Sequence, residues 1–193
     1  MSAARKDAAP APGAAAEDLT ERFVSGEEVF SGRLLHVHRD VVRLPDGHET
    51  VREYVRHPGA VMVVPLFEDG RVLLERQFRY PHRRDFIELP AGKLEPGEPH
   101  LETARRELLE ETGYVAAEWR RLGTLHPSIG YTDEAIELFL ARGLQHRGAA
   151  LDEGEFLEVL SLPLAEALAM VRDGGITDAK TVAGLLWVGS FLE

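Results

Sequence analysis

The sequence predicts an α/β sandwich, a mixed sheet with flanking helices, joined to a small N-terminal antiparallel β-sheet. Three observations indicate this class: alternating strand-like runs between residues 29 and 57, a nearly all-apolar strand at 60–67, and amphipathic helical patterns near the C-terminus. The 193 residues, 44% of them hydrophobic, suffice for one ordinary domain with a small appendage.

The first 18 residues are predicted to be a disordered tail. They are rich in Ala and Pro, and no apolar stretch follows the basic pair Arg5 and Lys6, as a secretory signal requires. A transit peptide is the alternative. Residues 19–57 are predicted to form the N-terminal sheet, in which Pro45-Asp46-Gly47 supplies a turn between two alternating runs. Residues 58–193 then form the main domain.

The main domain is predicted to begin with a strand pair, "AVMVVPLF" and "RVLLERQFRY", joined by the turn "EDG". The first strand is so apolar that it should be buried on both faces. "FIELPAGKL" adds a short strand. Further along the chain, strands are predicted at 118–126, 134–144 and 156–163, and helices at 164–174 and 178–192, the second capped by Asp178.

A helix is also predicted within "GKLEPGEPHLETARRELLEETGY", residues 92–114, which holds six acidic residues. Pro99 suits the first turn, and Gly113 suits a left-handed C-terminal cap. Leu101, Ala104, Leu108 and Thr112 recur at helical spacing and mark the buried face.

Three acids at the end of this helix, Glu107, Glu110 and Glu111, are expected to converge on one side. Two like charges 4 Å apart near a surface repel by about 4 kcal/mol. The carboxylates must therefore spread into water, as on an ordinary solvated face, or share a cation. Magnesium prefers carboxylate oxygens and substrate phosphates, so the cluster is a candidate site for phosphate chemistry. Without the cation, we expect a less stable helix or a raised carboxylate pKa.

Composition narrows the function further. The net charge of −11 argues against a nucleic acid or an anionic membrane as partner. The chain has no cysteine, which excludes disulfides, a thiolate nucleophile and cysteine-ligated metals. No apolar run reaches the roughly 20 residues of a membrane helix, so a soluble, cytoplasmic protein is predicted.

The full spacing of residues 92–114 resembles the Nudix box of the Nudix hydrolases. It matches at Gly92, Glu98, the Arg106-Glu107-Leu108 run, Glu110-Glu111 and Gly113. Tyr114 replaces the usual final aliphatic residue, a change expected to affect packing. The resemblance implies a Nudix fold and hydrolysis of a nucleoside diphosphate linked to another group.

The same resemblance assigns roles within the box. Glu107, Glu110, Glu111 and the backbone carbonyl of Ala91 would bind magnesium or manganese, in two or more ions. Glu98 would support this cluster, and Arg106 would pair with a box carboxylate.

Segments outside the box resemble ADP-ribose pyrophosphatases over roughly residues 28–190: "RQFRY", "ELPAGKLEPGE", "TDEAIELFLA" and "DAKTVAGLLW". The resemblance implies cleavage of ADP-ribose to AMP and ribose 5-phosphate. Arg79 would contact the phosphates or terminal ribose, Glu95 would lie near the metal site, and Glu134 would bind the terminal ribose. Ile129 stands where these enzymes typically carry a proline, which leaves GDP-mannose and other nucleotide sugars as alternative substrates.

Related enzymes take their general base from an acidic loop beyond the box. "LDEGEFLEV" offers Glu153 and Glu155 beside Gly154, and either residue could serve. The alternative is that both acids only increase solubility.

The resemblance also implies a homodimer that exchanges its N-terminal sheets and uses them to contact adenine. Phe30, Arg52 and Arg56 are the candidate contacts, although core packing or surface exposure would also suit these residues. A different class remains open: a Nudix-fold module that senses ADP-ribose without hydrolysing it. A pure scaffold would leave the box spacing unexplained.

Overall fold

The computed structural model describes residues 18–148 and 156–191. They form two compact units, which divide between Tyr54 and Val55. The first unit is a three-stranded sheet of β1 (Arg22–Ser31), β2 (His36–Arg43) and β3 (Glu49–Arg56), in the order β1-β2-β3. β1 and β2 are antiparallel.

β1 begins at Arg22, earlier than the strand-like pattern that starts at Val29. All ten residues of β1 are exposed, so no alternation between an inner and an outer face marks the strand in the sequence. Phe23, Val29 and Phe30 are among its exposed apolar side chains.

The second unit contains two sheets. A mixed four-stranded sheet has the order β7-β4-β9-β8, with β4 (Ala60–Pro65) parallel to β9 (Ile136–His146). β7 (Ala91–Lys93) and β8 (Tyr114–Leu125) are its antiparallel edge strands. The other sheet is antiparallel, in the order β10-β5-β6, and comprises β10 (Leu157–Pro163), β5 (Arg71–Arg79) and β6 (Arg84–Glu88).

The predicted pairing of the strands on either side of "EDG" is wrong. β4 and β5 lie in different sheets and share only the isolated bridge between Leu66 and Val72. The reason is that β7 and β9 already pair with both edges of β4. "FIELPAGKL" likewise forms two strands, because the chain leaves the first sheet after Glu88 and joins the second at Ala91.

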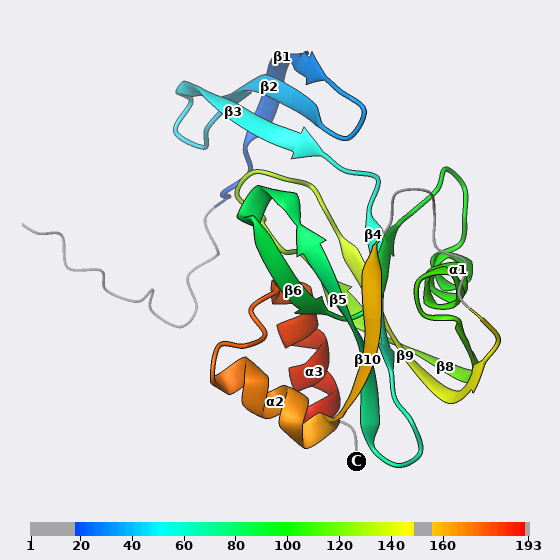
Figure 1. Ribbon diagram of the computed structural model, residues 1–193. Helices are drawn as coiled ribbons and strands as arrows, with labels where there is room; N and C mark the ends of the chain where they lie inside the picture. The colour runs from blue at the N-terminus through cyan, green and yellow to red at the C-terminus, as the bar shows by residue number, and fades with distance from the viewer. Residues whose placement is uncertain (1–17, 149–155, 192–193) are drawn as a thin grey trace, which may run out of the picture. The chain divides into compact units, whose positions relative to one another are not determined.

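Helices cover both sides of the sheets, as Figure 1 shows. α1 (His100–Thr112) lies on one side, and α2 (Leu164–Arg172) and α3 (Ala179–Phe191) lie on the other. A short 3-10 turn, Tyr80–His82, joins β5 to β6. The predicted mixed α+β class with a separate three-stranded sheet is confirmed.

The core explains why β4 is apolar throughout. Met62 and Val64 pack in the cluster that includes α2 and α3, whereas Val61 and Val63 pack in the cluster that includes α1. β4 therefore supplies both hydrophobic layers, with alternate residues on opposite faces.

Candidate active site

α1 carries the acidic residues and is fixed to the sheet by its apolar face. Ala104 and Leu108 are fully buried in the cluster formed with β4 and β9. Gly113 ends the helix with φ 75°, the left-handed region that favours glycine, and its N–H donates to the carbonyl of Leu109. Of the predicted buried face, Ala104, Leu108 and Thr112 are buried and Leu101 is partly buried, and the cap is as predicted. Together they fix which side of α1 faces the strands.

Arg106 pairs with three acids, of which Glu98 precedes this helix and Glu107 and Glu110 lie on it. Its guanidinium donates to both carboxylate oxygens of Glu98, each at 3.2 Å. Its Nη1 atom also lies 2.9 Å from Glu110 Oε2 and 2.9 Å from Glu107 Oε1. A planar guanidinium suits such multiple pairing because its five N–H donors have fixed directions.

Glu98 is held from two sides. Besides Arg106, the fully buried Thr103 donates its hydroxyl to Glu98 Oε2 at 2.8 Å. The hydrogen bonds from Arg106 and Thr103 lower the pKa of Glu98, and the hydrogen bond to Glu98 raises the pKa of Arg106. Glu98 therefore remains ionised.

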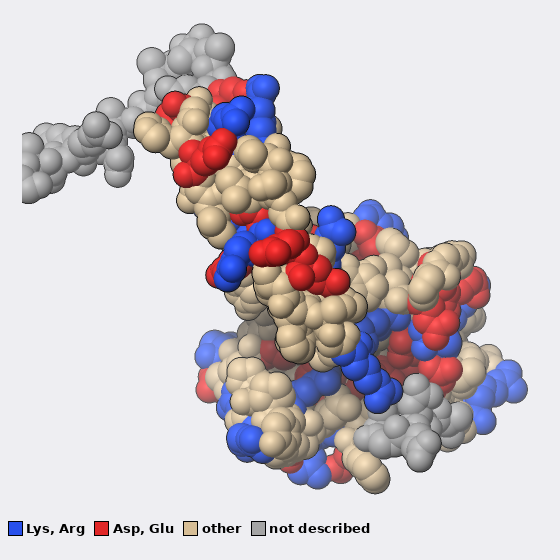
Figure 2. Space-filling view, turned by 90° about the horizontal axis from the view of Figure 1, so that it is seen from above, with Lys and Arg blue, Asp and Glu red and all other residues tan. Residues whose placement is uncertain are grey.

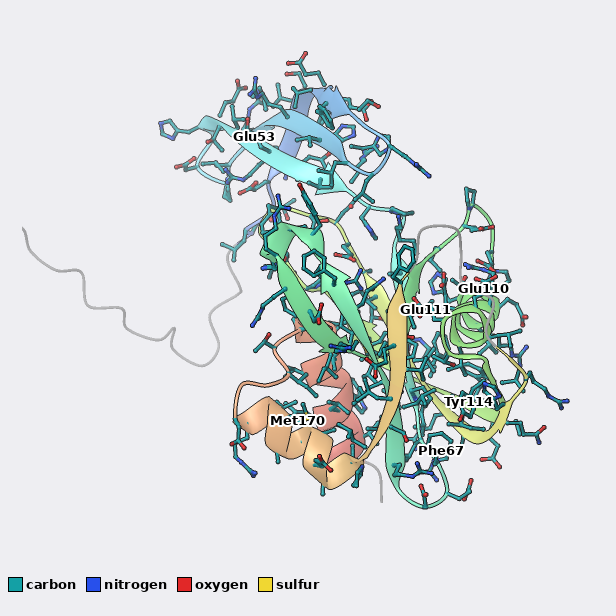
Figure 3. The ribbon with its side chains drawn as sticks, in the orientation of Figure 1. Glu53, Phe67, Glu110, Glu111, Tyr114 and Met170 are labelled. Carbon is teal, nitrogen blue, oxygen red and sulfur yellow. The ribbon has the colours of Figure 1, made fainter. Side chains whose placement is uncertain are left out.

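The backbone of β7 receives two of the box acids. Gly92 leaves room for Glu107, because a Cβ at residue 92 would lie 1.8 Å from the Cδ atom of Glu107. The N–H of Ala91 donates to Glu111 Oε2 at 3.1 Å, and Glu111 is only 7% exposed. In Figure 3, Glu111 lies on the side of α1 toward the sheets, and Glu110 lies further round the helix.

The expected convergence of Glu107, Glu110 and Glu111 is thus partial. Glu107 and Glu111 meet the Ala91–Gly92 backbone, and Arg106 pairs with both Glu107 and Glu110. Within the described residues, no three acidic or histidine side chains already surround one ion position.

A further carboxyl group, that of Glu75 on β5, lies next to the box acids on the side of the sheets. It is 3% exposed and hydrogen-bonds with Glu111. Burial raises the pKa of Glu75 to about 8, an effect to which the charge of Glu88 adds. Glu75 lies outside the box, and the sequence had not singled it out.

Glu88 lies directly opposite Glu75 in the β5–β6 register but has cationic partners. Arg79 donates to its two oxygens at 2.6 and 2.8 Å, and Lys180 forms a second ion pair. Burial acts to raise the pKa of Glu88, but Arg79 and Lys180 outweigh it and leave that pKa lowered. Asp178 accepts from Lys180 at 2.9 Å and caps α3 through the N–H of Thr181.

The predicted substrate contacts lie in several places. Arg79 is half-exposed and engaged with Glu88, and Glu134 lies 3.8 Å from the Nδ1 atom of His57. Glu95 is exposed in the loop between β7 and α1, and Ile129 is 85% exposed.

Glu153 and Glu155, the predicted general bases, lie outside the described residues.

In the N-terminal unit, Phe30 is 56% exposed on β1, and Arg52 forms an ion pair with Glu21. Arg56 is exposed at the end of β3. Tyr114, the unusual last residue of the box, packs edge-on against Phe67 and His146.

Sequence reasoning missed Thr103, Glu75, Glu88 and Lys180. The sequence held one signal for Glu75. This residue directly follows the apolar run Val72–Leu74, so a buried position could have been expected for it. The other three acquire their roles only through contacts distant in sequence.

The charged side chains on one face of the protein are of both signs. Figure 2 shows acidic and basic side chains interspersed on the face in view, without a broad basic area. Within the described residues, no helix is both long and apolar enough to cross a membrane.

The fold and the box together define a Nudix protein. A family model described as NUDIX domain matches residues 56–184, and a second, described as nucleoside diphosphate sugar hydrolase N-terminal domain, matches residues 21–55. The chain therefore belongs to the Nudix hydrolase family, as its box had indicated. Members of this family typically use divalent metal ions.

Individual relatives carry several functions. An ADP-ribose pyrophosphatase of Bacillus subtilis is 39% identical, over 89% of this chain and 94% of its own. A methanol dehydrogenase activator of Bacillus methanolicus is 41% identical, over 87% of this chain and 92% of its own. A solved structure described as an ADP compounds hydrolase matches with a TM-score of 0.82 and 27% identity, over 92% of this chain and 97% of that one.

Proposed function

We propose that this Nudix hydrolase cleaves the pyrophosphate bond of ADP-ribose, giving AMP and ribose 5-phosphate. The observation that carries the reaction is the meeting of Glu107 and Glu111 at the Ala91–Gly92 backbone. The choice of ADP-ribose is supported by the similarity to the Bacillus subtilis enzyme over nearly the whole length of both chains.

The residues present fit a divalent cation. Carboxylate oxygens are the ligands that magnesium and manganese prefer, and one buried carboxylate oxygen here, Glu75 Oε1, has no hydrogen-bond partner. Glu107, Glu110, Glu111 and the carbonyl of Ala91 would hold the metal, in two or more ions. When bound, the metal supplies charge neutralisation at phosphate oxygens and lowers the pKa of water.

The side chains of the protein divide the remaining work. Arg106 keeps Glu98, Glu107 and Glu110 in register. Arg79 contacts the phosphates or the terminal ribose of the substrate, and Glu134 binds the terminal ribose. Glu153 or Glu155 takes a proton from the attacking water. The oxygen of that water bonds to one phosphorus as the bond from this phosphorus to the bridging oxygen breaks.

Turnover on a substrate panel tests this function. Release of phosphate monoesters is measured on ADP-ribose, GDP-mannose, UDP-glucose, NADH and dGTP, with magnesium, manganese or chelator. ADP-ribose should give the highest kcat/KM, and chelator should abolish turnover. A Glu111→Gln preparation purified in parallel serves as the background control.

Other outcomes would redirect the proposal. A lead by GDP-mannose would show that the loop around Ile129 selects another sugar nucleotide. Binding of ADP-ribose without turnover would favour a sensing module. Retention of activity in chelator would reject the metal-dependent mechanism.

We also propose that the active form is a homodimer with exchanged N-terminal sheets. The exposed apolar side chains of β1, including Phe23 and Phe30, support a partner for this sheet. Phe30 and Arg52 remain the proposed adenine contacts. Sedimentation should give twice the chain mass, and an active, stable monomer would reject the dimer.

A further inference from the structure

The direction of Glu75 follows from the alternation of side chains along β5. Val72 and Leu74 pack with α2 and α3, whereas Leu73 packs in the cluster beneath α1. Glu75 lies two residues after Leu73 and therefore shares its face. The side chain of Glu75 consequently points toward α1, where it meets Glu111.

The hydrogen-bonding capacity of the buried Glu75 carboxyl group is only partly used. It is 3% exposed, and its Oε1 atom is the one buried side-chain oxygen or nitrogen in the described residues that lacks a hydrogen-bond partner. A buried polar atom without a partner destabilises the fold unless a ligand occupies the position beside it. Glu88, its cross-strand neighbour, shows the usual solution, since Arg79 and Lys180 both pair with it.

We propose that Glu75 is a further carboxylate of the divalent-cation site, reaching the cation from β5 beneath Glu111. This inference rests on the metal site of the proposed function and adds to it a residue outside the box. The unpartnered Oε1 atom becomes a ligand, directly or through a coordinated water molecule.

The chemistry of the surroundings favours a cation over an apolar or anionic occupant. The neighbouring groups are the carboxylates of Glu111 and Glu88, and both cations of Glu88 are already engaged with that residue. A hard divalent ion accepts six or more oxygen ligands, so the box carboxylates leave positions that Glu75 can fill.

Binding of manganese in the absence of substrate tests the role of Glu75. Titration calorimetry compares the wild type with Glu75→Gln, which keeps the size and hydrogen-bonding capacity of the side chain but removes its charge. We expect the Kd for manganese to rise about tenfold or more, as when a supporting group of a metal site is lost. The rise in Tm caused by saturating manganese should shrink in parallel.

Glu158→Gln is the matched control. Glu158 lies on the adjacent strand β10, opposite Arg76 and one register step from Glu75, and its exposed carboxylate pairs with Arg76. This variant should bind manganese as the wild type does. If Glu75→Gln does not fold, Glu75→Met provides a second test, because an apolar side chain of similar length suits a buried position.

The outcomes separate this inference from the proposed function. Unchanged manganese affinity in a folded Glu75 variant would overturn the inference even if ADP-ribose is hydrolysed. Weakened affinity would support it even if ADP-ribose is not the substrate. A wild type that binds no manganese would overturn the inference and the metal-dependent mechanism together.

Discussion

Two groups of acids close together in this molecule manage their like charges differently. The outer acids, Glu98, Glu107 and Glu110, surround the guanidinium of Arg106. The inner acids, Glu75 and Glu111, are buried beneath them and hydrogen-bond with each other. The comparison teaches that the outer acids share a cation of the protein, which offsets part of their charge, whereas the inner acids depend on a proton or on a bound ion.

The largest expected effect comes from the inner acids. Glu111→Gln should lower kcat/KM on ADP-ribose by about 10²–10³-fold, the loss typical of removing one electrostatic stabiliser. Glu110→Gln should cost about tenfold, because Arg106 still pairs with the two remaining outer acids. Steady-state kinetics in saturating magnesium measure both variants. Equal losses in the two variants would contradict the difference drawn between inner and outer acids. Full turnover by Glu111→Gln would reject the role of Glu111 in the reaction.

Removal of the guanidinium tests the outer acids. Arg106→Met leaves three carboxylates without their shared cation and should lower the free energy of unfolding by about 2 kcal/mol, less than for a fully buried pair because the site is partly exposed. Arg105→Met is the matched control, since Arg105 is exposed and pairs with Glu102 alone. Urea denaturation at neutral pH compares the two. Similar stabilities would mean that the outer acids do not need Arg106.

A further effect should appear as a pH dependence in metal-free protein. The pKa of Glu75 is raised from its usual 4.5 to about 8, so the folded state keeps a proton that the unfolded chain releases. The contribution of Glu75 to the free energy of unfolding is therefore largest below pH 4.5 and is lost as the pH rises to 8. The free energy of unfolding then falls by at most about 1.4 kcal/mol per pH unit.

Unfolding free energies at pH 5, 6, 7 and 8, in the presence of chelator, measure this slope. Glu75→Gln should make the profile flatter and should be more stable than the wild type at pH 8. A wild-type profile that Glu75→Gln leaves unchanged would show that Glu75 is ionised in both states.

The sequence was sufficient for features that depend on near neighbours. The buried face of α1 follows from Ala104 and Leu108 at helical spacing, and its end follows from the conformational freedom of Gly113. The fixed offsets of the box likewise predicted the family.

Long-range contacts were beyond the same reasoning. The hydrogen bond between Glu75 and Glu111 depends on how β5 passes beneath α1, and no pattern of spacing encodes that crossing. The pairing of β4 was wrong for the same reason, since its partners come from distant parts of the chain. The resemblance singled out Arg79 as a candidate, but its bidentate contact with Glu88 could not be predicted from the sequence.

The open N-terminal sheet has a consequence for the order of folding. β1–β3 leave the ribosome before the residues of the second unit, yet β1 buries none of its ten residues. A single nascent sheet of this kind presents apolar side chains and an unpaired edge until a partner covers them. Aggregation during synthesis should therefore depend on Phe23, Val29 and Phe30, and chaperones that bind apolar segments should engage this part of the chain first.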